Sequence, residues 1–267
     1  MCGTQVIQGS LQTPEMGSEP IQPSKLLTQR FSSITLEEMN KFAALQTRVD
    51  RKYIVTNKQC DELLETININ GQILTINGKR SMGYQSVYFD TPDLALYKDA
   101  AYRRRPRFKA RTRFYRSTGI AMLEVKTKDG RGKTVKIRTP YDSDRLYELT
   151  ESAKTFIEET VQTPGSSEQL RPTLTSQYQR TTIVDHDTST RMTCDEYLIC
   201  TDWEDRSVTF PYCILETKSS DIPSPFDMWL WENGHRPQRI SKYCTMLAVL
   251  HPDLPSNKWH RAIKNYL

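Results

Sequence analysis

The sequence predicts an α+β fold, in which one antiparallel sheet curls and closes into a barrel and helices cover its outside. Two observations lead to this prediction. At least seven segments alternate charged and apolar residues with a period of two, which is typical of strands with one polar and one buried face. Amphipathic segments that begin at helix-capping residues accompany them. An antiparallel sheet of this length tends to curl and close, and inward charged faces would line a polar tunnel that can hold a ligand.

The overall composition is that of a globular protein. The chain has 267 residues, of which 37% are hydrophobic and 26% are charged, and this is enough to bury a sizeable core. No apolar stretch approaches the roughly 18 to 20 residues that span a bilayer. The N-terminus is polar, rich in Pro, Gln and Ser, and lacks a signal-peptide pattern. We expect a disordered tail over residues 1–28, a single domain over residues 29–267, and a cytoplasmic location, with peripheral membrane association as an alternative.

The first elements of the domain are predicted from two capping boxes and the strand between them. Thr35 and Glu38 form one box, and Thr56 and Gln59 form a second, which opens a helix to about residue 66. Residues 48–55 alternate in polarity. This strand would present Arg48, Asp50 and Lys52 on one face and Val49, Tyr53 and Val55 on the other.

The positive charge is concentrated in one segment. Residues 103–138 hold fourteen Lys and Arg against two acidic residues, although the net charge of the whole chain is only +5. A run of like charge is usually a solvated face or a nucleic-acid-binding tail, but here the charges alternate with apolar residues. Residues 108–115 predict a strand with Lys109, Arg111 and Arg113 on one face and Phe108, Ala110, Thr112 and Phe114 on the other. Residues 86–90 predict a strand before it, with Tyr88 and Asp90 on the charged face.

The remaining elements follow from the same two patterns. Strands at 122–128 and 134–138 flank a turn at Asp129 and Gly130 and predict a hairpin. Further alternating segments lie at 178–184, 191–195 and 214–218. Helices are predicted over 143–161 and 226–233, and after a capping Ser241.

A tunnel lined by cations and a few carboxylates suits a polyanion with closely spaced charges, because Arg and Lys make charge-assisted hydrogen bonds to phosphate. Glu124 and Glu216 are poor anion ligands and would instead hold Mg²⁺ or Mn²⁺. Their alternative role is an ion pair with Lys126 or Lys218. If the tunnel is crowded with cations, truncating Arg111 should weaken triphosphate binding without lowering thermal stability, since it relieves repulsion.

The cysteines give no sign of a metal site in the sequence. They are widely spaced, without a C-x-x-C pair or a partnering run of His. We therefore expect free, buried thiols at Cys2, Cys60, Cys194, Cys200, Cys213 and Cys244.

Several of these charged motifs occur in an order that resembles a known family. They are Arg48-x-Asp50-x-Lys52-Tyr53, Tyr88-Phe89-Asp90, Lys109-x-Arg111-x-Arg113, Glu124-x-Lys126, Tyr178-x-Arg180, Arg191-x-Thr193-x-Asp195, Glu216-x-Lys218 and Ser241-Lys242-Tyr243. The order is similar to that of the VTC domain, named for the vacuolar transporter chaperone and widespread in bacteria. The VTC domain belongs to the triphosphate tunnel metalloenzymes, and the resemblance covers about residues 28–250.

The resemblance implies an eight-stranded antiparallel tunnel barrel. It also implies polyphosphate polymerase activity, in which the terminal phosphate of ATP is added to a growing polyphosphate chain with a divalent metal. The positions that would act on the phosphates are Lys52, Arg111, Arg113, Lys126, Arg180, Arg191 and Lys242. Ser241 resembles another phosphate-contacting position, Glu216 resembles the metal-binding glutamate, and Glu124 is a second metal candidate. Further substrate-binding candidates on the charged face are Lys109, Lys218 and Tyr88.

One departure from the superfamily bears on the reaction. The superfamily's first strand reads E-x-E-x-K, whereas this chain has Arg48-x-Asp50-x-Lys52. The loss of one carboxylate weakens a two-metal hydrolase interpretation and favours the VTC branch.

Three alternative functions stay open at this point. The chain could be an inorganic triphosphatase of the same fold, or a polyphosphate-binding module without catalysis. A nucleic-acid binder ranks third, because it should place stacking aromatics among its cations, whereas Phe108 and Phe114 fall on the apolar face. We therefore expect ATP, triphosphate and polyphosphate as ligands and no nucleic acid. Family members act beside membrane proteins, so a membrane-protein partner is a further expectation.

Overall fold

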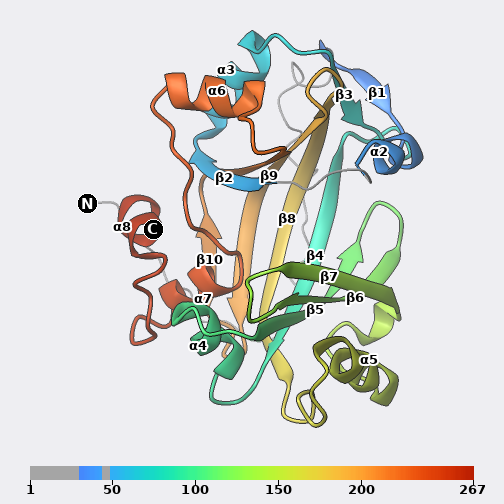
Figure 1. The fold of residues 1–267 in the computed structure, drawn as a ribbon, viewed down its shortest axis with the longest axis vertical. Helices are drawn as coiled ribbons and strands as arrows, with labels where there is room; N and C mark the ends of the chain where they lie inside the picture. The colour runs from blue at the N-terminus through green and yellow to red at the C-terminus, as the bar shows by residue number, and fades with distance from the viewer. Residues whose placement is uncertain (1–29, 44–48) are drawn as a thin grey trace.

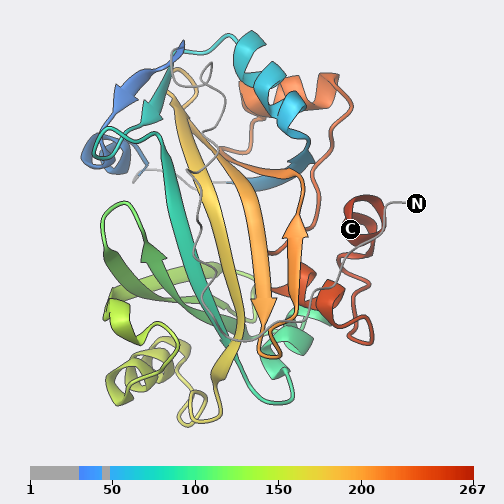
Figure 2. The same cartoon turned by 180° about the vertical axis from the view of Figure 1, so that it is seen from behind.

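The structure is a computed structural model that describes residues 30–43 and 49–267. The predicted tail over residues 1–28 and the strand residue Arg48 lie outside the described residues. The described chain forms one eleven-stranded sheet (Figures 1 and 2). Its strands are β1 (Ser32–Ile34), β2 (Val49–Val55), β3 (Gly71–Leu74), β4 (Ser81–Asp90), β5 (Arg107–Tyr115), β6 (Ile120–Lys128), β7 (Thr134–Tyr141), β8 (Arg171–Asp185), β9 (Thr190–Asp202), β10 (Ser207–Phe210) and β11 (Cys213–Ser219).

Helices lie around this sheet, which confirms the α+β class. None of the described helices is both long enough and apolar enough to cross a membrane. A short 3₁₀ helix, η1, covers Ser143–Arg145. The α-helices are α2 (Leu36–Ala43), α3 (Asn57–Thr66), α4 (Ala95–Ala101), α5 (Glu151–Val161), α6 (Pro225–Glu232), α7 (Cys244–Leu250) and α8 (His260–Tyr266).

The main path of the sheet runs in the order β2-β11-β9-β8-β4-β5-β6-β7, with every neighbouring pair antiparallel. The path has the eight strands that the resemblance implies. Among the described residues, however, β2 pairs only with β11 and β7 pairs only with β6. Backbone hydrogen bonds therefore do not close the sheet, and the closed barrel is not confirmed.

The sheet nevertheless curls strongly. In Figure 1 the strands β5, β6 and β7 run across the long, upright strands β4, β8 and β9. In a flat sheet, six spacings would separate β6 from β2 by roughly 29 Å, too far for a strong charge interaction. Burial and the positive charge of Lys52 on β2 nevertheless lower the pKa of Lys126 on β6. Strands β2 and β6 therefore face each other across the inside of the curl.

Apolar side chains cover the outside of the curl, as the alternation predicted. Val87 of β4, Ala110 of β5 and Leu123 of β6 pack with Ile157 of α5 in one buried cluster. Leu63 of α3 lies in a second cluster, which also holds buried residues of β2, β9, β11 and α6. A third cluster holds α7 against β8, β9 and β10, but it contains Tyr88 and Ile54, which share a side of the sheet with Arg111 and Lys52, so it lies on the inside of the curl. The exception is β7, where Val135 and Ile137 are exposed.

The two capping boxes at the start of the domain agree with the prediction. Thr35 and Glu38 exchange the expected capping bonds, and so do Thr56 and Gln59 at the start of α3. The single helix predicted over 143–161 is wrong, because it divides into η1 and α5. The cause is Thr150, which is extended and whose hydroxyl accepts the backbone N–H of Ala153, starting a new helix.

Asp90 corrects the prediction for β4. It was expected on the charged face beside Tyr88, but its buried carboxylate accepts the backbone N–H groups of Leu96 and Tyr97 at 2.9 and 2.8 Å. It also accepts the hydroxyl of Tyr243. Asp90 therefore anchors α4, a helix that the sequence patterns did not reveal.

Candidate active site

The predicted site residues lie on one side of the curled sheet, which we call the inner face. Residues directly paired across antiparallel strands point to the same side, and the register pairs Lys52 with Glu216, Lys218 with Arg191, and Arg180 with Asp195. On the other half of the sheet, Tyr88 pairs with Arg111, and Arg111 with Glu124. The inner face as defined here comprises Asp50, Lys52, Tyr88, Lys109, Arg111, Arg113, Glu124, Lys126, Lys136, Arg180, Arg191, Asp195, Glu216, Lys218 and Lys242.

Glu124 is the centre of one ion-pair group on this face. Arg111 Nε donates to its Oε2 at 2.8 Å, and Lys136 Nζ donates to its Oε1 at 3.0 Å. Arg113 Nη1 lies 3.9 Å from the same carboxylate. Burial alone would raise the pKa of Glu124, but the attraction of these three cations outweighs it and holds that pKa well below its usual range.

These contacts correspond to the alternative ion-pair role of Glu124, although the partners are Arg111 and Lys136 rather than Lys126. A metal role for Glu124 stays a prediction, and its carboxylate already accepts hydrogen bonds at both oxygens. The contacts also change the expectation for Arg111. Without Arg111, the buried carboxylate of Glu124 would lose its nearest cation. The free energy of unfolding should therefore fall rather than stay unchanged.

Asp195 is the centre of a second group. Arg180 binds both of its carboxylate oxygens, with Nη2 at 2.7 Å from Oδ2, and Lys242 contacts Oδ2 as well. Burial would raise the pKa of Asp195, but Arg180 and Lys242 lower it to about 2. Lys242 comes from the loop before α7, so this group joins that loop to β8 and β9. Asp195 was visible in the motif Arg191-x-Thr193-x-Asp195, but it was not proposed as a site residue.

Glu216 is the centre of a third group. Lys218 contacts its Oε1, and Lys52 Nζ lies 3.6 Å from its Oε2. Lys218 Nζ also lies 3.6 Å from Asp50 Oδ2. Burial would raise the pKa of Glu216, but Lys52, Lys218 and Arg180 hold it well below the usual range. The charge of Arg180 therefore links this group to the Asp195 group.

Tyrosines hold the arginines in place between these groups. The rings of Tyr84 and Tyr178 stack with centroids 5.3 Å apart, and the guanidinium groups of Arg113 and Arg180 lie 5.4 and 5.2 Å from the Tyr84 ring. Such cation–π contacts fix the planes of the guanidinium groups. Arg113 also donates to the Tyr178 hydroxyl at 3.0 Å. Tyr84 and Lys136 were not predicted as site residues, although the alternation over residues 134–138 predicted Lys136 on a charged strand face.

Lys109 and Ser241 meet beside the loop before α7. Lys109 Nζ donates to Ser241 Oγ at 3.2 Å and contacts Cys244 Sγ at 2.9 Å. Ser241 Oγ accepts the backbone N–H of Cys244, the first residue of α7, but the cap position of this helix is Tyr243 rather than the predicted Ser241. Tyr88 stacks on Tyr243 of this loop, with centroids 5.1 Å apart. The fold thus brings Ser241 and Lys242 to the cationic strands, although more than a hundred residues separate them from Lys109.

A family model and several solved structures match this chain. No curated protein matches the chain. A solved structure from Vibrio parahaemolyticus, described as a candidate adenylate cyclase, is 15% identical, with 76% of this chain and 98% of that chain covered and a TM-score of 0.45. A protein from Pyrococcus horikoshii is 13% identical, with 76% and 97% covered and a TM-score of 0.44.

A third solved structure is a candidate adenylyl cyclase from Hippeastrum, described with a dominant triphosphatase activity. It is 12% identical, with 76% of this chain and 96% of that chain covered and a TM-score of 0.45. The family model described as VTC domain matches residues 47–251. That span contains the three ion-pair groups of the inner face. Because the match covers most of the chain, this protein belongs to the VTC domain family.

Proposed function

We propose that this protein is a polyphosphate polymerase, which transfers the terminal phosphate of ATP to a growing polyphosphate chain on the inner face. One observation carries the proposal. Cations of β2 and β6, which lie six strand spacings apart along the path, face each other across the curl, and the cations of the inner face outnumber its carboxylates. Such a surface favours a ligand with several adjacent negative charges. Membership of the VTC family supports the same function.

The ion pairs orient the arginines of this surface before phosphate binds. Arg111 and Arg180 are each held by a buried carboxylate, so their remaining N–H groups are oriented before a ligand arrives. Lys126 and Lys218 have lowered pKa values, mainly because they are buried. A bound phosphate would add the negative charge that favours their protonated form.

A divalent cation fits Glu216 best among the predicted ligands. Its Oε2 is 3.6 Å from Lys52 Nζ, which is longer than a hydrogen bond, so this oxygen has room for another partner. Mg²⁺ and Mn²⁺ are commonly held by one or two carboxylates together with substrate phosphates. Glu216 and the neighbouring Asp50 would hold the ion, which would neutralise charge that develops on the transferred phosphoryl group.

The proposed reaction assigns a role to each cation according to its place on the inner face. In the proposed transfer, an oxygen of the terminal phosphate of the chain forms a bond to the γ-phosphorus of ATP, the bond between that phosphorus and the bridging β–γ oxygen breaks, and ADP leaves. Arg111, Arg113 and Arg180 would bind and orient the phosphates, and Lys242 would secure them from the loop before α7. Lys52 on β2 and Lys126 on β6 would attract the negative charge of the phosphates from the two facing sides of the curl. A membrane-protein partner stays a prediction.

Incubation of the purified chain with ATP and Mn²⁺, followed by separation of long polyphosphate from free phosphate, tests the proposal. We expect polyphosphate that lengthens with time. Lys126→Ala should slow this strongly, whereas Lys58→Ala, which removes an exposed lysine from α3, should not. Release of free phosphate alone would instead indicate a triphosphatase, and binding without turnover would indicate a binding module. Either result would contradict the polymerase.

A further inference from the structure

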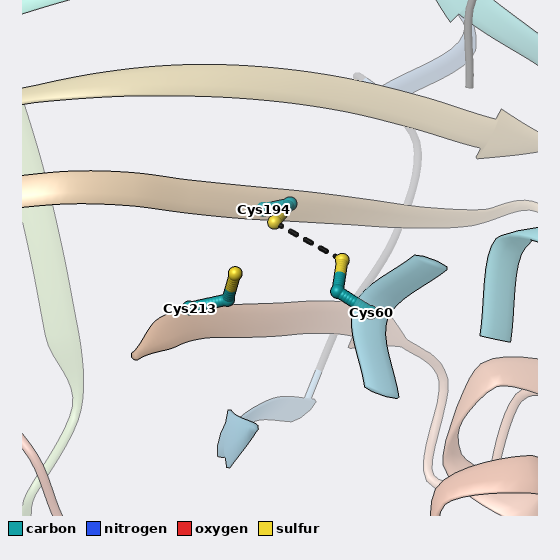
Figure 3. Close-up of side chains that lie close together, drawn as sticks. All are labelled: Cys60, Cys194 and Cys213. Carbon is teal, nitrogen blue, oxygen red and sulfur yellow. Dashed lines mark hydrogen bonds between the residues drawn. The ribbon is translucent and has the colours of Figure 1, made fainter. Parts of the chain in front are cut away.

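Three buried cysteines meet on the outside of the curl. Cys60 of α3, Cys194 of β9 and Cys213 of β11 are almost fully buried, and their sulfur atoms all lie within 4.8 Å of one another. Figure 3 shows Cys213 pointing toward the other two, with Cys60 and Cys194 in contact at 3.4 Å. We call these three residues the cysteine cluster. The sequence predicted separate free thiols, because Cys60 and Cys194 are 134 residues apart.

The strand register explains why the cluster forms. Thr193 and Asp195 alternate with Cys194, so Cys194 points away from the inner face. Ile214 pairs with Asp195, and Cys213 therefore comes next to Glu196 across the two strands, on the same side as Cys194. Helix α3 packs over this side and supplies Cys60. The cluster therefore lies directly behind the inner face, on separate residues.

Glu196 is a second, independent observation at this place. Its side chain is 6% exposed, and its Oε2 makes no hydrogen bond. A buried carboxylate oxygen without a partner is costly, and a cation beside the sulfur atoms would remove that cost.

We propose that the cysteine cluster is a structural site for a thiophilic divalent ion, Zn²⁺, bound by Cys60, Cys194 and Cys213, with Glu196 as the fourth ligand. Zinc is commonly held in a tetrahedral site by Cys thiolates, with carboxylate oxygen as an accepted further ligand. Zn–S bonds of about 2.3 Å in a tetrahedron place sulfur atoms about 3.8 Å apart. The observed cluster is close to that spacing. Glu196 lies opposite Cys213 across the two strands, outside the group of three sulfur atoms, and would turn toward the ion.

Binding would change the hydrogen bonds and the protonation of the cluster. Each thiol would lose its proton to solvent as its sulfur binds the ion, so affinity should rise with pH. Cys213 now donates its thiol hydrogen to Asn57 Oδ1 at 3.0 Å. After deprotonation, the Asn57 amide could turn and donate an N–H to the thiolate instead. Asn57 begins α3, and the positive end of this helix also favours the added negative charge.

The bound ion would cross-link α3 to β9 and β11. Asp195 and Glu216 lie on the opposite side of these two strands, so the ion would hold the backbone behind two of the three ion-pair groups. This structural role does not depend on the reaction at the inner face. It also differs chemically from the proposed Mg²⁺ or Mn²⁺ site, because hard ions prefer oxygen ligands.

Titration of the reduced full-length chain with Co²⁺ tests the proposal, because cobalt replaces zinc and thiolate ligation gives a strong near-ultraviolet charge-transfer absorption. We expect this signal to saturate at a single ion per chain and to disappear when Zn²⁺ is added. Cys213→Ser should lose it. Cys200→Ser should keep it, because Cys200 is equally buried on β9 but lies outside the cluster. Glu216→Gln should also keep it, which separates this site from the inner face.

Glu196→Gln tests the fourth ligand, and we expect it to weaken Co²⁺ affinity about 10- to 100-fold. Unchanged affinity would show that Glu196 does not take part. The absence of a thiolate signal in the wild-type protein would overturn the site, and this result does not depend on whether any variant folds.

Discussion

Arg111→Ala is expected to lower the free energy of unfolding by about 3 kcal/mol. Glu124 is 2% exposed, and removing Arg111 takes away its nearest cation while the carboxylate stays buried. The value belongs at the lower end of the range for broken buried pairs, because Lys136 and Arg113 remain as partners. Denaturant titration of the variant and the wild-type protein measures the difference.

A double-variant cycle identifies the cause. Adding Glu124→Gln to Arg111→Ala should restore part of the lost stability, because the buried group then carries no charge. Arg131→Ala is the matched control: this arginine is exposed in the turn between β6 and β7, and its removal should change stability by less than about 0.5 kcal/mol. If Arg111→Ala is as stable as the wild-type protein, the pair with Glu124 is not structural, and the original expectation of relieved repulsion is correct.

Glu216→Gln is expected to lower metal-dependent turnover at least about 100-fold while the protein stays folded. The amide has the shape of the carboxylate but lacks the charge that holds a divalent cation. Polyphosphate formation measured over a series of Mn²⁺ concentrations checks this. Glu62→Gln, an exposed position on α3, serves as the control and should behave as the wild-type protein does. If neither a chelator nor Glu216→Gln changes the rate, the metal role of Glu216 is wrong.

Local patterns in the sequence predicted the strands because alternation is a property of neighbouring residues. Lys109, Arg111 and Arg113 lie on the inner face, while Phe108 and Ala110 are buried on the outer one. The two capping boxes gave helix starts for the same reason. Thr150 shows the limit: a local hydroxyl bond ended one predicted helix and started another, although the apolar pattern continued across it.

Features that depend on distant parts of the chain could not be predicted in this way. The partners of Glu124 come from β5 and β7: the register puts Arg111 directly opposite Glu124, whereas Lys136 reaches it diagonally, because Arg138 is the residue paired with Glu124 on β7. The cysteine cluster forms only because α3 packs over β9 and β11. The spacing of the three cysteines along the chain therefore does not reveal it. Closure of the sheet is a property of all its strands together, and the described residues show a curl without hydrogen bonds between β7 and β2.

Binding of adjacent phosphates to the inner face is the central claim, and thermal unfolding with different anions tests it most directly. A ligand that binds only the folded state raises the melting temperature. Triphosphate can touch cations from several strands at once, whereas orthophosphate reaches few, and single-stranded nucleic acid has phosphates separated by sugars. At equal concentration we therefore expect a large rise with triphosphate, a small one with orthophosphate and little change with an oligonucleotide. A larger rise with the oligonucleotide than with triphosphate would contradict the claim.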